Sequence, residues 1–346
     1  MSFLSPLAIY GLIFLSLILS IFTLSLIFIK YWKKPSKLKN SLINASLSFF
    51  TVAFVLLFLE IGAYLFIVRS DSFSFTLANK RWFNTYWQPI NTLGYRDDNY
   101  SLEQLKNNKV VFVVGDSFIA GQGIKDYKNR ISNLLEEKLG KGWLVANIAQ
   151  VGWSTPDEYQ GIIKYPYKPN IIVLSYFIDD IRQASSQLNE DSQFRWQQLL
   201  QPVPSYLQGI VNQSYLANYF YWQWYRSHNN QPESIYWEKM QGYYTNPVTW
   251  GIHQQELKSI IDYAKAHQIT LIPILFPNLV SLEKSKPILD KVAVFFQEQG
   301  TTPINLTTLF AGKTPAELVV NQVDAHPNEW VNQQVSEIVF KVIKAQ

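Results

Sequence analysis

The sequence contains no cysteine, which excludes disulfide bonds, thiolate nucleophiles and cysteine-ligated metal sites. Histidine is scarce, with 4 residues in a chain of 346. No group of histidines and carboxylates has the spacing of a metal site, so we expect neither a metal nor an organic cofactor. An excess of one charge is also lacking: the formal net charge is +4, and no stripe of Lys and Arg crosses the polar part of the chain. We therefore expect no nucleic-acid partner.

Two long runs in the first 68 residues are almost free of charge. Pro6–Ile29 has no charged residue, and Ile43–Val68 has only Glu60. Each run exceeds the roughly 20 residues that a helix needs to cross a bilayer. We therefore predict a two-helix transmembrane anchor over residues 1–68. A cleaved signal peptide fits the first run less well, because no basic residue precedes it and the run is too long.

The loop between the two apolar runs is rich in lysine. Cytoplasmic loops carry such an excess of positive charge, so we expect this loop in the cytoplasm and the rest of the chain outside it. The lysines are Lys30, Lys33, Lys34, Lys37 and Lys39. Glu60 is a functional candidate because it is an acid within a predicted span. We favour the simpler interpretation, in which it snorkels outward or stays protonated against the partner helix.

After a linker and lead-in over residues 69–108, the pattern changes to short apolar runs that alternate with amphipathic segments. This alternation over residues 109–346 predicts a three-layer α/β/α sandwich with a parallel sheet. An aromatic-rich insertion, about 184–250, interrupts it. Such an insertion can line a sugar-binding groove or lie at a membrane interface, but we favour a lid or packing element. Strands are expected at 110–114, 143–148, 171–176, 269–276 and 303–306, and helices at 130–139, 157–164, 253–267, 286–298 and 329–344.

Ser117 is the candidate nucleophile. It follows the first predicted strand directly, in Gly115-Asp116-Ser117, and ligands bind at the carboxyl ends of parallel strands. The surrounding residues match neither the nucleophile elbow of other serine hydrolases nor a phosphate-binding loop. A lone serine in this place is more often a helix cap, so the prediction also needs a base.

His326 is the histidine best placed to act as that base. It lies in Asp324-Ala325-His326-Pro327-Asn328, just before the last helix. Asp324 can orient the imidazole, which is then free to take the Ser117 proton. Alternatively, Asn328 or Asp324 caps the helix, and the two roles are compatible. The other histidines are expected to face solvent or to lie in the polar insertion: His253, His267 and His228.

Together these segments resemble the SGNH (GDSL-type) hydrolases. The resemblance rests on GDSFIAGQG at residues 115–123, on Gly152 in QVGWS, on the closing DAHPN, and on the lead-in NTLGYRD at residues 91–97. It extends from Asn91 to the C-terminus, apart from the aromatic insertion. It implies an SGNH or flavodoxin-like fold and the chemistry of a serine esterase or O-acyltransferase.

The resemblance also implies residue roles. Ser117 would be the nucleophile, His326 the base and Asp324 its orienter, with the backbone N–H groups of Ser117 and Gly152 forming an oxyanion hole. The family has an Asn donor where this chain has Asp179. An ionised carboxylate cannot donate, whereas a protonated one can. Three outcomes stay open: a reduced or altered activity, a neutral Asp179, or another donor such as Asn147 or Asn328.

We therefore expect a membrane-anchored, extracytoplasmic serine esterase or O-acyltransferase that works through an acyl-Ser117 intermediate. Its substrate would be an acyl ester, such as an acetylated glycan or a lipid. Hydrolysis and transfer share their first half-reaction, so the sequence does not separate them. The alternative is a catalytically silent binding or scaffold protein with the same fold. Asp179 favours this alternative, and the joint presence of Ser117, Asp324 and His326 opposes it.

Overall fold

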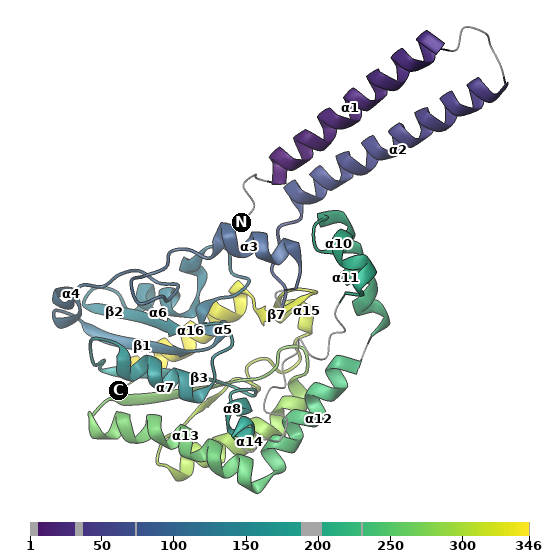
Figure 1. The fold of residues 1–346 in the computed structure, drawn as a ribbon. Helices are drawn as coiled ribbons and strands as arrows, with labels where there is room; N and C mark the ends of the chain where they lie inside the picture. The colour runs from purple at the N-terminus through teal and green to yellow at the C-terminus, as the bar shows by residue number, and fades with distance from the viewer. Residues whose placement is uncertain (1–5, 32–36, 73–74, 188–202, 230, 346) are drawn as a thin grey trace. The chain divides into compact units, whose positions relative to one another are not determined.

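The computed structural model describes residues 6–31, 37–72, 75–187, 203–229 and 231–345, traced in Figure 1. These residues form two compact units. The first, which we call the anchor unit, comprises Met1–Val68, Thr76–Ala78 and Val203–Arg226. The second, which we call the sheet unit, comprises Arg69–Phe75, Asn79–Pro202 and Ser227–Gln346.

The anchor unit begins with two long apolar helices, α1 (Pro6–Tyr31) and α2 (Lys37–Phe66). Both are long and apolar enough to cross a membrane, and only 0% and 11% of their apolar windows are buried. This exposure distinguishes them from the core helices of a globular domain, whereas membrane spans and signal anchors share their length and composition. The unit also contains α10 (Ser205–Val211) and most of α11 (Tyr215–His228).

The sheet unit is built on five parallel strands in the order β2-β1-β3-β4-β5. This is the strand order of the flavodoxin-like doubly wound folds, so the predicted fold class is confirmed. Each strand lies within one or two residues of its predicted bounds, because uncharged β-branched runs mark strands that are buried on both faces. The strands are β1 (Lys109–Gly115), β2 (Trp143–Ala149), β3 (Ile171–Phe177), β4 (Thr270–Phe276) and β5 (Ile304–Asn305).

Helices cover both faces of this sheet, as Figure 1 shows. Successive side chains of β1 point to opposite faces: Val110 and Phe112 join one buried core, and Val111 and Val113 join the other. The first core is closed by α7 (Thr155–Lys164), α13 (Pro247–Ala266) and α14 (Leu282–Glu298). The second is closed by α6 (Ile131–Leu139) and α16 (Glu329–Lys344).

Two stretches lie outside the regular alternation of strands and helices. Residues 69–108, expected to be a linker and lead-in, contain α3 (Leu77–Tyr86) and α4 (Leu102–Lys106) and several buried polar side chains. The aromatic insertion is divided between the two units. Its helix α12 (Gln231–Thr245) contributes Trp237 and Met240 to the core of the sheet unit, whereas α10 and most of α11 belong to the anchor unit. Residues 188–202 of the insertion lie outside the described residues.

Candidate active site

Ser117 lies at the topological switch point of the sheet. After β1 the chain crosses to β2 on one side and later returns to β3 on the other, and doubly wound folds bind ligands where this happens. Ser117 opens the short helix α5 (Ser117–Ala120), and the Asp116 carboxylate accepts the N–H of Phe118 at 2.8 Å. A side chain on Gly115 would lie 2.7 Å from Ile119 Cγ1, so only glycine fits before this turn.

The structure brings together the three side chains predicted to form the site. His326 lies in β7 (Asp324–Pro327), which pairs with β6 (Val319–Asn321). Its Nε2 lies 2.8 Å from Ser117 Oγ across 209 residues of sequence, and its Nδ1 lies 2.5 Å from Asp324 Oδ1. Asn328 caps α16 by accepting the N–H of Val331 at 3.0 Å, so the capping and pairing roles coexist.

The electrostatics favour proton acceptance by His326. Burial lowers the pKa of His326, but the charge of Asp324 and the hydrogen bond to it outweigh burial and raise the pKa above 6.5. Burial raises the pKa of Asp324, yet the charge of His326 lowers it below the ordinary value. Asp324 therefore stays ionised and binds the Nδ1 proton, which leaves Nε2 to accept a proton from Ser117.

The segment just beyond α2 supports the loop that carries Asp324. The Ser72 N–H donates to the Val323 carbonyl at 3.0 Å, and the Ser72 hydroxyl oxygen accepts the N–H of Ala325 at 2.7 Å. The Ser70 carbonyl accepts a hydrogen bond from the Asn321 amide at 3.2 Å. The sequence did not predict these contacts, since no local pattern connects residues that lie 251 and 253 positions apart.

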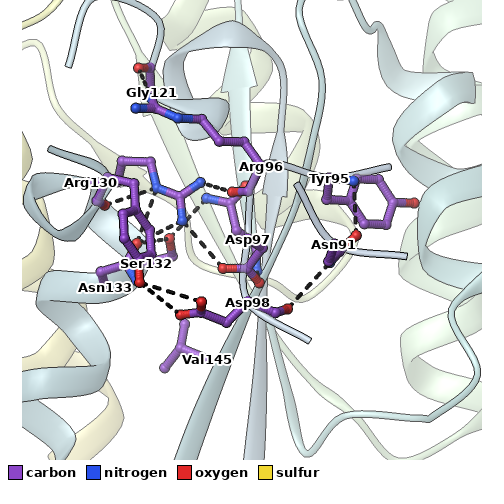
Figure 2. Close-up of polar contacts among 12 residues, drawn as sticks. Asn91, Tyr95, Arg96, Asp97, Asp98, Gly121, Arg130, Ser132, Asn133 and Val145 are labelled. Atoms are coloured by element: carbon purple, nitrogen blue, oxygen red, sulfur yellow. Dashed lines mark hydrogen bonds and ion pairs between the residues drawn. The ribbon is translucent and has the colours of Figure 1, made fainter. Parts of the chain in front are cut away.

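Arg96, from the lead-in, binds the backbone of the segment that follows α5 (Figure 2). Its guanidinium donates to the carbonyls of Gly121 at 2.7 Å and Ile124 at 2.9 Å, and also to Tyr86 at 2.7 Å. Its side chain stacks over Trp87, 4.9 Å from the ring centroid. A buried arginine with several carbonyl partners fixes the backbone at the exit of α5.

A buried ion pair next to Arg96 joins α6 to β2. Arg130 Nη2 lies 3.2 Å from Asp97 Oδ1, and the two side chains are 0% and 1% exposed. Asp97 Oδ2 accepts the backbone N–H of Asn147 at 2.9 Å, and Arg130 also donates to the Arg96 carbonyl. Figure 2 shows these side chains converging on one another. The resemblance singled out Arg96 and Asp97 only as part of a lead-in, and their partner Arg130 was missed.

Gly152 follows the end of β2 in a left-handed conformation, with φ of +80°. Its loop is tied to α8 (Arg182–Ser186), which follows β3, because Ser154 Oγ donates to Gln183 Oε1 at 2.7 Å. Loops from three neighbouring strands, β2, β1 and β3, therefore meet at this edge. The role of the Gly152 N–H as an oxyanion donor stays a prediction.

Asp179 is paired with an arginine. Its Oδ2 lies 3.1 Å from Arg182 Nε, and the charge of Asp179 is the largest influence on Arg182, whose pKa it raises. The Asp179 carboxylate therefore lies against a permanent cation, and a carboxylate in such a pair is a hydrogen-bond acceptor.

The two alternative donors considered from the sequence are engaged elsewhere. The Asn147 amide donates both hydrogens, to the Ile119 carbonyl and to Ser132 Oγ, each at 2.8 Å. The Asn328 amide donates to the Glu317 carbonyl at 2.8 Å. The backbone N–H groups are therefore the best remaining candidates for an oxyanion hole.

A cluster of three carboxyls, of which Asp116 and Asp180 are buried and Asp179 is half-buried, lies beside Ser117. One carboxylate oxygen from each of Asp116, Asp179 and Asp180 lies within 4.8 Å of the other two. Among the described residues, this group has a spacing that could hold a cation. Burial, and then the charge of Asp179, raise the pKa of Asp116 to about 7. Burial also raises the pKa of Asp180, and the nearby charge of Glu158 adds to this effect. Sequence spacing did not reveal the cluster, because Asp116 follows β1 whereas Asp179 and Asp180 follow β3.

The prediction that His253 faces solvent is wrong. His253 is fully buried; its Nε2 lies 3.0 Å from the Tyr176 hydroxyl and its Nδ1 lies 2.9 Å from Glu256 Oε2. Burial lowers the pKa of His253. The helical spacing could have revealed this, because His253 lies four residues before Leu257 and seven before Ile260, on the buried face of α13.

No protein-family model matches the sequence, and no curated protein matches it. Solved structures do match, at low identity. One is a member of the lipolytic G-D-S-L family from Veillonella parvula, at 13% identity and a TM-score of 0.39, covering 69% of this chain and 100% of that one. Another is the psychrotrophic esterase EstA from Pseudoalteromonas sp., at 13% identity and 0.39, covering 69% and 98%. A third is a carbohydrate acetylesterase family member from Sinorhizobium meliloti, at 10% identity and 0.37, covering 68% and 98%.

Proposed function

We propose that this protein is a membrane-anchored serine esterase whose sheet unit lies outside the cytoplasm. The observation that carries the proposal is the continuous chain from Ser117 Oγ through His326 to Asp324, with distances of 2.8 and 2.5 Å, at the switch point of the sheet. The acyl ester of a glycan or a lipid is the proposed substrate class.

In the proposed acylation, Ser117 Oγ attacks the ester carbonyl carbon while His326 Nε2 takes the hydroxyl proton. The ionised Asp324 stabilises the imidazolium that forms. The carbonyl oxygen becomes an oxyanion, which accepts hydrogen bonds from the backbone N–H groups of Ser117 and Gly152. Each such donor is worth on the order of 3 kcal/mol. The intermediate then expels the alcohol, which receives the proton from His326, and leaves acyl-Ser117.

Deacylation repeats these steps with a second nucleophile. His326 deprotonates a water molecule, which attacks the acyl carbon. The bond to Ser117 Oγ then breaks, Oγ takes the proton back from His326, and the acid leaves. If the hydroxyl of another molecule attacks instead of water, the same intermediate yields acyl transfer. Exclusion of water from the site decides between the two outcomes.

Asp179 shapes the proposed oxyanion hole. As a bare carboxylate it would repel the developing negative charge, but its ion pair with Arg182 offsets that charge. The site would then work with two backbone donors and without the side-chain donor of the SGNH pattern. The reaction would be slower than with three donors, but the pathway would be the same.

The anchoring part of the proposal rests on α1 and α2 and on the lysines of the loop between them. The excess of positive charge on this loop favours a cytoplasmic position. A reporter fused after Gln346 should then be active only outside the cytoplasm. Activity of a cytoplasmic reporter at this position would refute the orientation and leave the esterase proposal intact.

The catalytic proposal is tested by labelling the purified full chain with a fluorophosphonate, which phosphonylates activated serines. We expect labelling that is lost in Ser117→Ala and His326→Ala and kept in Ser259→Ala, a serine on α13. A panel of acetyl and longer-chain esters, with and without alcohol acceptors, then identifies the acyl group and separates hydrolysis from transfer.

The pairing of Asp179 with Arg182 also favours a second candidate, a silent binding protein with the same fold, because the usual donor is missing. The same labelling experiment decides between them. If no fluorophosphonate labels the folded full chain between pH 5 and 9, the esterase proposal is refuted and the binding protein is favoured.

A further inference from the structure

The segment Val203–Arg226 of the anchor unit, which we call the aromatic segment, has an unusual composition. It contains no charged residue before Arg226, the last in the segment. In α11, half of the positions are aromatic: 7 of the 14 residues are Tyr, Trp or Phe. Uncharged segments rich in Tyr and Trp are typical of the boundary between lipid and water, where amphipathic rings concentrate.

Two stripes of bulky side chains lie exposed on this segment. Tyr206 and Ile210 on α10 are 81% and 60% exposed, and Phe220 and Trp224 on α11 are 61% and 58% exposed. Each pair is spaced by four residues, so its members lie on one face of their helix. The opposite faces are buried, through Val211 on α10 and through Asn218, Trp222 and Tyr225 on α11. Exposed apolar stripes of this kind mark a contact surface.

Glu60 of α2 attaches the aromatic segment to the apolar helices. Its carboxylate accepts hydrogen bonds from the Ser214 hydroxyl at 2.6 Å and from the N–H groups of Tyr215 and Leu216 at 2.7 and 3.0 Å. It also accepts one from the Tyr10 hydroxyl of α1 at 2.7 Å. An anion at the first turn stabilises α11 through its N-terminal N–H groups. Tyr10 lies on α1, the partner helix of α2. The favoured interpretation, a snorkelling or protonated Glu60, did not include the contact of Glu60 with α11.

The position of Glu60 along α2 determines its expected depth in the bilayer. The 21 residues from Asn40 to Glu60 follow the last lysine of the loop. At about 1.5 Å per residue they span roughly 32 Å, close to the ~30 Å thickness of a hydrocarbon core. With the lysines at the inner surface, Glu60 lies at the outer boundary of the core, and the start of α11 lies there with it.

We propose that the aromatic segment lies in the outer interface of the bilayer, with its two exposed stripes among the lipids. This inference rests on the two-helix anchor of the proposed function and adds a second, lateral membrane contact to it. Because the segment is uncharged up to Tyr225, its insertion depends on apolar and aromatic contact and not on anionic lipid headgroups.

The absence of cysteine allows a clean test by single-cysteine spin labels on the full chain in phosphatidylcholine vesicles. The labelled variants are Phe220→Cys and Trp224→Cys. Leu47→Cys, 65% exposed on α2, is the lipid reference, and Val294→Cys, 51% exposed on α14, is the aqueous reference. Collision with oxygen reports lipid, and collision with a water-soluble nickel chelate reports water. We expect positions 220 and 224 to resemble position 47.

Positions 220 and 224 that resemble position 294, while position 47 stays lipidic, would overturn this inference alone. An aqueous position 47 would overturn the anchor and the inference together, and fluorophosphonate labelling of the same samples reports on the esterase separately. Spin–spin broadening that disappears on dilution with unlabelled protein would identify a second copy as the occupant. A lipidic signal that requires phosphatidylglycerol would contradict contact through uncharged residues.

Discussion

Two buried acid–base pairs in the sheet unit differ in the base that carries the positive charge. Asp324 pairs with His326 at 2.5 Å, and Asp97 pairs with Arg130 at 3.2 Å. Histidine gains and loses its proton near neutral pH, whereas arginine keeps its charge. The first pair can therefore move a proton to and from Ser117, and the second can only hold its elements together. The same carboxylate chemistry would support the proposed reaction in one region and rigidity in the other.

Burial acts in the same direction on both acids, but their partners differ in effect. Burial raises the pKa of Asp97, and the charge of Arg130 only partly reverses the shift. For Asp324, the charge of His326 outweighs burial, so the net pKa is lowered. Asp324 therefore stays ionised at a lower pH than Asp97 does.

The largest expected effect comes from Asp324→Asn. The amide keeps the shape of the carboxylate but favours the wrong tautomer of His326, so kcat/KM should fall by about 10⁴-fold. The thermal unfolding midpoint should change little by comparison. Ester hydrolysis and thermal unfolding of the same preparation measure the two effects. A loss of less than tenfold would show that His326 does not depend on this pair.

The pH dependence of kcat/KM tests the Asp324–His326 pair in a second way. His326 must be neutral to accept a proton, and its pKa is raised above 6.5, so kcat/KM should fall as the pH drops through a value above 6.5. In Asp324→Asn the raising charge is lost while burial still lowers the pKa, so this acidic limb should move to lower pH. A limb that stays in place would assign the titration to another group.

Arg130→Met should affect stability more than chemistry. It leaves Asp97 buried without its cation, which should cost about 3–5 kcal/mol of unfolding free energy. Lys138→Met is the matched control. It breaks a pair with Glu337 that is 32% and 38% exposed, and solvent screens such a pair so that it contributes little to stability. Denaturant unfolding measures both. Equal effects would remove the distinction between the buried and the exposed pair.

Asp179→Asn tests a third pair, in which an arginine lies close to the site. An amide can donate to the oxyanion, so acylation by a fluorophosphonate should become faster, on the order of 10-fold. The Asp116 pKa, which the Asp179 charge raises, should fall in this variant. Arg182→Lys, which keeps the cation, is the control for disturbance of the loop. A slower reaction in Asp179→Asn would show that the carboxylate is not an impaired donor.

The smallest effect is expected from Glu60→Gln. The amide keeps an acceptor oxygen but loses the charge at the first turn of α11, which should cost about 1 kcal/mol locally. Hydrogen exchange should report faster exchange at Tyr215 and Leu216, whose N–H groups bind Glu60. Hydrolysis of a small soluble ester should be unchanged. Unchanged exchange at both amides would rule out Glu60 as the cap of α11.

Much of the architecture could be predicted from local pattern. Uncharged β-branched runs placed the strands, and amphipathic periods placed the helices, because both depend on neighbours within a few residues. Glu329–Lys344 was predicted with its observed bounds. The short spacing in DAHPN allowed the Asp324–His326 pair to be predicted, and the position of Ser117 after a buried strand indicated the edge of the sheet.

By itself, the sequence determined the parallel α/β pattern, the two apolar helices and the residue types of the candidate site. Only the tertiary structure decided which partners those residues bind. It buried His253 against Tyr176, paired Arg130 with Asp97, and connected Glu60 to the first turn of α11, 155 residues along the chain at Tyr215. Hydrophobic periodicity acts over a few residues, whereas hydrogen bonds and ion pairs form between whichever groups packing brings within about 3 Å.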